Sequence, residues 1–160
     1  MRYGKGTTTA LDANAPIAVI GTRSASPYGL KMGRDMAWQI ARCGGLVVSM
    51  LTNGVDAAAA KGALLAGCKC IAVLGTPHEC EPGRLPLDIA ASGALISEYP
   101  PGTKPLKSFF RDRNRIAAGI SVGVVVVEAP EKSGTRLFAA EAAEQGKEIF
   151  AVPGNVDSEN

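Results

Sequence analysis

Six short apolar runs constrain the fold of this chain more than any other feature of its sequence. Most are unbroken series of Val, Ile, Leu and Ala, and they lie at residues 16–21, 45–50, 70–75, 94–99, 122–129 and 148–154. An apolar run of this length without polar alternation is typical of a strand buried on both faces, as in a parallel sheet. We therefore predict six strands of one mostly parallel sheet.

Stretches with helical spacing separate these runs, at residues 28–43, 55–66, 85–91, 107–119 and 135–145. Regular alternation of strand and helix predicts βαβ units with right-handed crossovers. We expect an α/β protein with an extended Rossmann-like, doubly wound sheet and helices on both faces. Gly67 and Gly146 stand where two of the helices should end, the position that glycine favours.

The length of 160 residues suits a single domain, which we place at 15–160. The polar segment 1–14 is expected to be disordered. Four cysteines lie in or beside apolar stretches, and the sequence shows no signal peptide and no run of 18 apolar residues. We expect a cytoplasmic protein with free thiols and no membrane partner.

Positive charge is concentrated in one segment. The formal net charge is only +2, but residues 102–115 contain five basic residues and one acid, so this segment carries 5 − 1 = +4 and the rest of the chain −2. A polyanionic partner would therefore be bound through this segment rather than by overall charge.

The turn after the first strand, "GTRSASPYG" (21–29), has the composition of an anion-binding turn. A turn that begins at Gly21 and enters a helix can point backbone N–H groups at an anion. Thr22 and Ser24 add hydroxyl donors, and Arg23 can form a paired hydrogen bond with phosphate. The alternative is an ordinary strand-to-helix turn. A dinucleotide site is disfavoured, because the sequence has no G-x-G-x-x-G and no acid at the end of the second strand.

Two further turns have a similar composition. After the second strand, Asn53 and Gly54 can adopt positive φ and could line the same site. Asp56 follows them either as a helix cap or turn organiser, or as a ligand contact. The third turn contains the sequence Ser133, Gly134 and Thr135, in which a hydroxyl can cap the helix and the glycine permits close approach.

The segment "FFRDRNRIAAGIS" (109–121) combines arginines with an apolar helical stripe. Lys107, Arg111 and Arg115 fall in one outward row, which is either a solvated face or a surface that follows a nucleic-acid backbone. Phe110 lies between this row and the apolar stripe, where it could stack on a base.

Arg113 differs from these residues, because it projects only about 40° from the apolar stripe formed by Phe109, Ile116 and Ile120. A charge so placed needs an internal partner or a bound anion. Glu98 and Glu128 are the candidate partners, and a ligand contact is equally compatible with the pattern.

No metal, cofactor or catalytic residue is assigned. Cys68, Cys70, His78 and Cys80 are spaced C-x-C-x7-H-x-C, which is not a usual zinc pattern. The sequence also offers no nucleophile with an identifiable base.

Seven segments, taken in order, resemble the DNA-processing protein A (DprA/Smf) family over residues 16–155: "GTRSASPYG", "NGVDAAAAKGAL", "IAVLG", "ALISEYPPGTKP", "RDRNRIAAGIS", "VVVVEAPEKSGT" and "GKEIFAVPGN". The resemblance implies an extended Rossmann fold that binds single-stranded DNA, forms a homodimer and helps a RecA-type recombinase during natural transformation and recombination. It further implies contacts with the DNA strand at the matching positions, which are Gly21, Thr22, Arg23, Lys107, Phe110, Arg113, Asn114 and Arg115.

Three substitutions depart from the pattern of that family, and so do the added Arg111 and the loop "TPHECEPGRLP" (76–86). Met50 stands where a glycine is usual, Ala60 where a histidine is usual and Phe138 where a threonine is usual. One alternative function is a small-nucleotide sensor or phosphoribohydrolase-like enzyme of a related Rossmann-like family, although the glycine pair of its catalytic turn is missing here. Another is a partner-binding scaffold that has lost its affinity for DNA.

Overall fold

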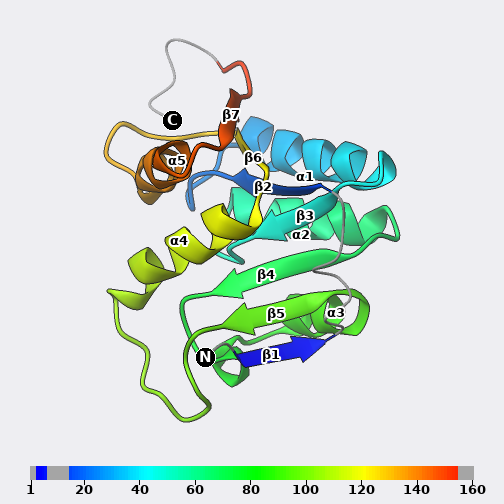
Figure 1. Cartoon of the computed structure of the whole chain (residues 1–160). Coiled ribbons are helices and arrows are strands. Elements are labelled where there is room, and N and C mark those ends of the chain that lie inside the picture. The colour runs from blue at the N-terminus through cyan, green and yellow to red at the C-terminus, as the bar shows by residue number, and fades with distance from the viewer. Residues whose placement is uncertain (1–2, 7–14, 155–160) are drawn as a thin grey trace.

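The computed structural model describes residues 3–6 and 15–154. They form one sheet of seven strands in the order β1-β5-β4-β3-β2-β6-β7, with five α-helices and one 3-10 helix (Figure 1). The elements are β1 (Tyr3–Gly6), β2 (Pro16–Ile20), α1 (Pro27–Arg42), β3 (Leu46–Ser49), α2 (Val55–Leu65), β4 (Cys70–Leu74), η2 (His78–Cys80), α3 (Arg84–Ser92), β5 (Ala94–Ser97), α4 (Phe109–Ile120), β6 (Gly123–Val126), α5 (Gly134–Glu144) and β7 (Glu148–Ala151).

The sheet is doubly wound around β2. From β2 the chain moves outward through β3, β4 and β5, then crosses back through α4 to build β6 and β7 on the other side of β2. All neighbouring strands are parallel except β1, which pairs antiparallel with β5. The strand order therefore reverses between β2 and β6, and a ligand site is expected beyond the carboxyl ends of the strands at that point.

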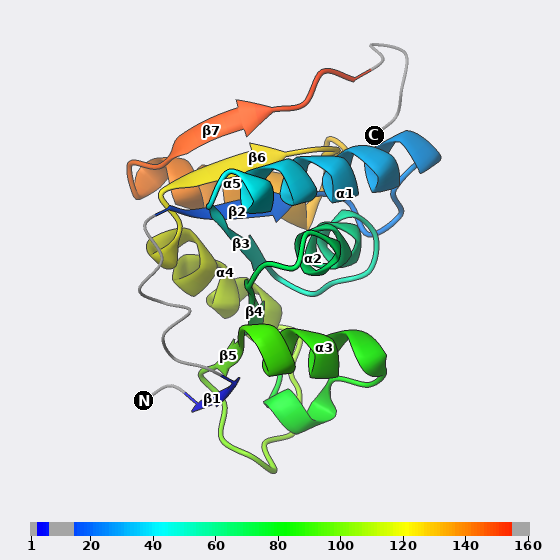
Figure 2. The same cartoon turned by 90° about the vertical axis from the view of Figure 1, so that its right-hand side faces the viewer.

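Helices cover both faces of the sheet (Figure 2). One buried cluster joins α1, α2 and α3 to one face, and Val19, Ala37 and Ile89 are all fully buried in it. A second cluster joins α4 and α5 to the other face through residues such as Ile116 and Phe138. Burial on both faces explains why β3, β4 and β5 lack polar alternation. The edge strand β7 differs from the prediction, because all four of its residues are exposed.

The predicted doubly wound α/β fold is confirmed. Each predicted strand and helix is present, with ends that shift by a few residues, and Gly67 and Gly146 follow α2 and α5 with φ of +72°. None of the helices in the described part of the chain has the length and apolar character needed to span a bilayer.

The N-terminal segment differs from the prediction. We expected 1–14 to be disordered, but residues 3–6 form β1 at the edge of the sheet; residues 1–2 and 7–14 lie outside the described residues. The sequence of β1, "YGKG", carries no apolar run, and its strand geometry comes from pairing with β5.

Candidate nucleic-acid interface

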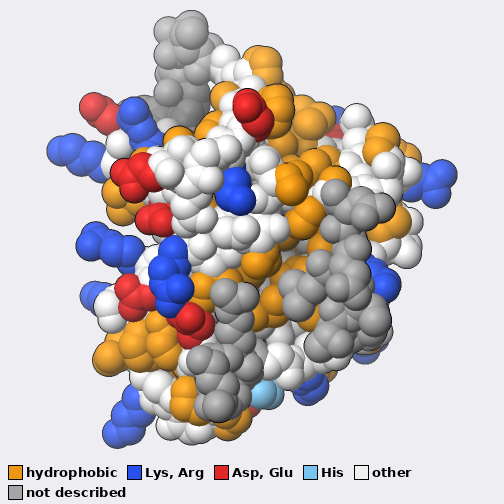
Figure 3. Space-filling model, in the orientation of Figure 1, with side chains coloured by type: hydrophobic (Ala, Val, Ile, Leu, Met, Phe, Trp, Pro, Cys, Tyr) orange, Lys and Arg blue, Asp and Glu red, His pale blue; other side chains and the backbone are white. Residues whose placement is uncertain are grey.

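A hollow of about 380 Å³ lies at the carboxyl edge of the sheet, where the strand order reverses. We call it the main hollow. It is lined by Gly21, Thr22, Arg23, Met50, Thr52, Asp56, Phe110, Arg111, Arg113, Asn114, Ser133, Gly134, Thr135 and Leu137. Four separate segments thus meet there, from the turns after β2, β3 and β6 and from the first half of α4. Lys and Arg side chains gather along the α4 side of the molecule, at the left of Figure 3.

A second hollow of about 250 Å³ adjoins the first. This side hollow shares a wall with the main hollow, formed by Arg23, Met50, Thr52, Phe110 and Arg113. Its remaining lining consists of Leu51, Asn53, Gly75 and Glu81. Each hollow also contains one carboxylate, Asp56 in the main hollow and Glu81 in the side hollow.

Several backbone amides of the turn after β2 are engaged within the protein, which limits what this turn can offer an anion. We expected this turn to aim N–H groups at an anion. Instead, the amide of Gly21 donates to Oδ1 of Asp56 at 3.3 Å, and the amide of Thr22 donates to the backbone oxygen of Glu128 at 2.9 Å. Within the described residues, the donors that this turn retains for a ligand are the Arg23 amide, the Thr22 hydroxyl and the Arg23 guanidinium.

Glu128 also occupies the N-terminus of α1. Its carboxylate accepts from the amide of Ser26 at 3.0 Å and from the Ser26 hydroxyl. A Cβ added at Gly29 would lie 2.2 Å from the same carboxylate, so Gly29 provides the room for it. In dinucleotide-binding Rossmann folds the pyrophosphate sits at this helix terminus. Here an internal carboxylate fills that position.

The N-terminus of α5, by contrast, opens on the main hollow. Ser133 caps the helix by accepting from the amide of Arg136 at 3.4 Å. Among the described residues, the amides of Gly134 and Thr135 donate to no protein acceptor. Since unpaired amides and the helix dipole favour negative charge, an anion is best held at this end of the hollow.

Phe110 forms the centre of the shared wall. The guanidinium carbons of Arg23 and Arg113 each lie 5.7 Å from its ring centroid, a distance typical of cation–π contacts. A Cβ at Gly75 would lie 3.0 Å from Cδ1 of Phe110, so a glycine there lets the ring approach β4. The ring and the Arg23 guanidinium offer flat surfaces on which a base can stack.

Arg113 is a buried residue, with only 3% of its surface exposed. Its Nη1 donates to the carbonyl oxygens of Met50 at 2.7 Å and of Val73 at 3.0 Å. The carboxylate partners proposed from sequence are therefore wrong: Glu98 pairs with Arg115, and Glu128 pairs with Ser26. Burial lowers the pKa of Arg113 to about 10, against the opposing effect of Asp56, so the guanidinium remains charged at neutral pH.

Asp56 is a buried carboxylate, 1% exposed, whose charge acts on Arg113. Its Oδ1 accepts from Gly21 and its Oδ2 from the Thr52 hydroxyl, so it joins the turns after β2 and β3. Burial raises the pKa of Asp56 to about 6, although Thr52 and Arg113 act in the opposite direction. Of the two roles considered from sequence, this geometry favours the turn organiser.

Four predicted residues lie outside both hollows. Lys107 precedes α4 in a turn, so the predicted helical row contains Arg111 and Arg115 only. Arg115 is exposed and pairs with Glu98. Ser24 is exposed, and Gly54 packs closely under the turn after β2: a Cβ added to it would lie 2.2 Å from the Thr22 oxygen.

Phe109 stacks on Tyr99 with ring centroids 3.7 Å apart, so it anchors the start of α4.

Several lining residues were not assigned to the site from sequence, namely Met50, Leu51, Thr52, Gly75, Glu81 and Leu137. Asp56 and Arg111, which the sequence analysis left with two possible roles each, also line the main hollow. The position of Thr52, directly after a predicted strand, was a usable signal for a site residue. Glu81 gave no such signal, because it lies in the long segment between β4 and α3.

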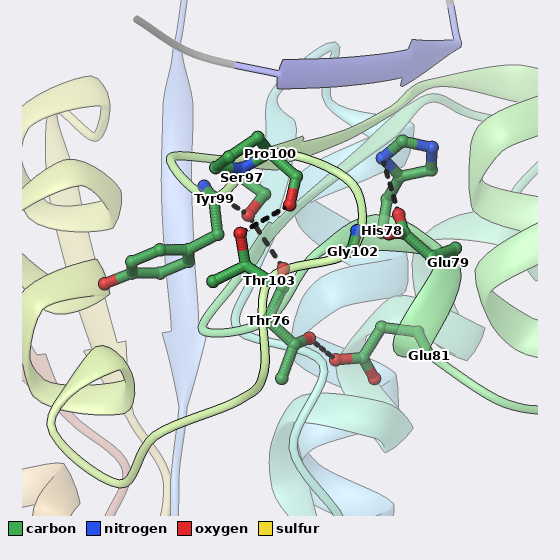
Figure 4. A network of polar contacts seen from close by, with 9 residues as sticks. All are labelled: Thr76, His78, Glu79, Glu81, Ser97, Tyr99, Pro100, Gly102 and Thr103. Carbon is green, nitrogen blue, oxygen red and sulfur yellow. Dashed lines mark hydrogen bonds and ion pairs between the residues drawn. The ribbon is translucent and has the colours of Figure 1, made fainter.

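A network of hydrogen bonds fixes that segment against the loop before α4 (Figure 4). The Ser97 hydroxyl donates to the Thr76 carbonyl at 2.7 Å, and the amide of Gly102 donates to Oε1 of Glu79 at 2.7 Å. The Thr76 hydroxyl donates to Glu81. The Glu81 carboxylate is thereby oriented at the border of the side hollow.

A sequence model of the family described as DNA recombination-mediator protein A matches residues 1–160. The chain belongs to this family. Among its relatives, the DNA processing protein DprA of Bacillus subtilis is 39% identical over 158 residues, covering 96% of this chain and 53% of that protein. Protein Smf of Escherichia coli is 42% identical over 145 residues, covering 88% of this chain and 39% of that protein. The chain thus spans about half the length of these curated relatives or less.

Solved structures of the family have the same fold. DNA processing protein A from Streptococcus pneumoniae superposes with a TM-score of 0.92 at 35% identity, covering 99% of this chain and 56% of that one. The protein from Helicobacter pylori superposes with a TM-score of 0.91 at 29% identity, covering 98% of this chain and 74% of that one, and was described for its single-stranded DNA binding mode. A molybdenum cofactor binding protein from Rippkaea orientalis, with a TM-score of 0.64 at 20% identity, shares the fold alone.

The three departures from the DprA/Smf pattern differ in where they lie. Met50 lines both hollows and is 8% exposed, so its side chain narrows the space between them. Ala60 and Phe138 are fully buried on opposite faces of the sheet. Of Met50, Ala60 and Phe138, only Met50 lines a hollow, and the added Arg111 lines the main hollow as well.

Proposed function

We propose that this domain binds single-stranded DNA, largely without regard to sequence, across the main hollow. The observation that carries the proposal is the joining of two kinds of binding surface in one hollow. The unpaired amides of Gly134 and Thr135 suit a phosphate, and the Phe110 ring with the Arg23 guanidinium suits a stacked base. The exposed Arg111 adds charge beside them.

The residues predicted to contact the DNA strand differ in how directly they could reach it. Gly21 shapes the hollow, while Thr22, Arg23, Phe110 and Asn114 present side chains to it. Arg113 is a buried part of the shared wall, so its guanidinium attracts an anion in the hollow by its charge rather than by an exposed contact. Lys107 and Arg115 belong to the surface that leads toward the hollow along α4, where they can attract the backbone over a longer range.

The cellular role that we propose follows from family membership. The protein serves DNA processing in natural transformation and recombination, as a cytoplasmic homodimer that passes the strand to a RecA-type recombinase. The names of the relatives support DNA processing. Co-purification with a RecA-type protein in the presence and absence of single-stranded DNA tests the recombinase step.

The small-nucleotide alternative is not favoured, because the helix terminus that holds a pyrophosphate in related folds is filled by Glu128. A bound strand can avoid that position, because its phosphates can lie near α5 instead.

The decisive experiment is a salt-dependent titration. Fluorescence anisotropy of a labelled oligothymidylate is compared with a duplex of equal length, for the wild-type chain, Arg23→Ala, Phe110→Ala and the control Arg42→Ala. Arg42 is exposed near the end of α1, at the opposite edge of the sheet. The single strand is expected to bind more tightly than the duplex. Each lost phosphate contact should reduce the salt slope by about 0.7.

Equal affinities of the wild-type chain and Arg23→Ala, together with an unchanged salt slope, would exclude this hollow as the binding site. A loss shared equally by Arg42→Ala would show that overall charge, rather than the hollow, determines affinity.

A further inference from the structure

The two carboxylates of the segment between β4 and α3 have different environments (Figure 4). Glu79 is engaged with the loop before α4, because its Oε1 accepts from the amide of Gly102. Glu81 lines the side hollow, and its Oε1 accepts from the Thr76 hydroxyl. Within the described residues, Oε2 of Glu81 accepts no hydrogen bond. Glu81 therefore brings an oriented carboxylate with free acceptor capacity to the hollow.

The two hollows differ in what they offer a phosphate. In the side hollow the carboxylate of Glu81 lies with Arg23 and Arg113 and opposes their attraction for an anion. The main hollow adds the unpaired amides of Gly134 and Thr135 and the exposed Arg111, so a phosphate is better held there. A nucleobase carries no charge, and its volume is well below the roughly 250 Å³ of the side hollow. Phe110 and Arg23 belong to the shared wall, so a base that stacks on them can direct its edge toward Glu81.

A carboxylate is a hydrogen-bond acceptor without donors when it is ionised. Among base edges it suits an exocyclic amino group, such as N4 of cytosine or N6 of adenine. On thymine and uracil it can accept from N3–H, but the O2 and O4 oxygens on either side of that group repel it. Arg23 and Asn53 add donors at the same hollow, which can satisfy a neighbouring ring nitrogen or carbonyl.

We infer that the side hollow is a nucleobase subsite in which Glu81 selects bases that carry an exocyclic amino group. This inference rests on the proposed binding of single-stranded DNA and adds to it a base preference, superimposed on contacts that ignore sequence. Glu81 is then a specificity-determining residue, whereas Arg23 and the start of α5 supply the affinity common to all strands.

The test compares two oligonucleotides that differ at one edge of the base. Twelve-residue deoxycytidine strands carry an amino group at position 4 of the base and no proton on N3. Deoxyuridine strands of the same length carry an oxygen at position 4 and a proton on N3. Anisotropy titrations at pH 7.5 and constant salt should show tighter binding of the cytidine strand. One amino contact at a partly exposed edge should give about a fivefold preference, the lower end of the range for a good base contact.

Glu81→Ala should reduce the ratio of the two affinities to within twofold, without weakening the uridine strand, because a repulsive charge is removed. Glu81→Gln keeps one acceptor and should retain part of the preference, and it provides a second variant if the alanine protein folds poorly. Glu79→Gln is the matched control: it removes the same charge from the same segment, but its side chain faces Gly102 rather than the hollow. It should leave the ratio at the wild-type value.

Equal affinity of the wild-type chain for the two strands would overturn the inference while leaving the proposed function intact. A preference that persists in Glu81→Ala would also overturn it. Absence of binding to either strand would instead refute the proposed function, and the inference with it.

Discussion

Replacing Arg113 tests whether this arginine serves the structure before it serves a ligand. Arg113 is 3% exposed and donates to the carbonyl oxygens of Met50 and Val73, which lie just after β3 and within β4. Arg113→Ala removes a buried donor from both carbonyls, at about 1–3 kcal/mol each. It also removes a positive charge that favours the ionised form of the buried Asp56. We expect a total loss of about 3–5 kcal/mol in the free energy of unfolding.

Arg115→Ala is the matched control, two residues along the same helix. The Arg115 side chain is 55% exposed, and its ion pair with Glu98 lies at the surface. Such a pair contributes below about 1 kcal/mol. Urea denaturation followed by circular dichroism gives both values, and an unchanged m-value shows that the compared transitions expose similar surface.

Arg113→Lys keeps the charge but cannot reproduce the geometry of the guanidinium, so we expect a stability between that of the wild-type chain and Arg113→Ala. The reasoning is refuted if Arg113→Ala costs no more than Arg115→Ala, because the two carbonyl contacts would then contribute nothing measurable. Loss of strand binding by Arg113→Ala without loss of stability would instead assign the residue to the ligand.

Three further predictions concern single residues. Burial raises the pKa of Asp56 from 3.8 to about 6, so its contribution to stability is present at low pH and is lost as the pH rises from about 4 to 6. The expected fall in the free energy of unfolding is about 3 kcal/mol. Urea titrations at several pH values should show this fall for the wild-type chain but not for Asp56→Asn, and parallel curves for the two proteins would contradict it. Gly54→Ala should destabilise the chain by more than about 2 kcal/mol, because φ is +80° and the new Cβ would meet the Thr22 oxygen, whereas Gly67→Ala has open space and should cost about 1–2 kcal/mol in the same urea titration. Glu128→Ala should uncover the N-terminus of α1, so that inorganic phosphate raises the melting temperature of this variant more than that of the wild-type chain; equal responses would show that the carboxylate does not occupy an anion site.

The fold could be predicted from sequence because its signals are local. The apolar runs of β2 to β6 are buried on both faces, and the helices between them show apolar spacing within a single element. β1 could not be predicted, because "YGKG" has no strand signal of its own and depends on β5, about 90 residues away in the sequence.

The composition of the candidate site could be predicted from sequence, but its hydrogen-bond partners could not. Hydroxyls and glycines after predicted strands indicated the segments that meet in the main hollow. Which amides remain free depends on pairs that are remote in sequence, such as Glu128 with Ser26, 102 residues apart. The partners of Arg113 are backbone carbonyls, which leave no trace in the residue pattern, and carboxylates were therefore the natural but mistaken choice.

The hydrogen bonds at the helix N-termini affect how this doubly wound sheet could bind a polymer. Two helix N-termini flank the point where strand order reverses, and the protein neutralises one of them with its own carboxylate, Glu128. The open terminus, at α5, lies on the same face of the sheet as α4. An anion held there is displaced from the usual dinucleotide position toward Arg111 and Phe110. A single phosphate group at α5 would then have neighbours along a basic helix, an arrangement that suits successive phosphates of a strand better than one compact nucleotide.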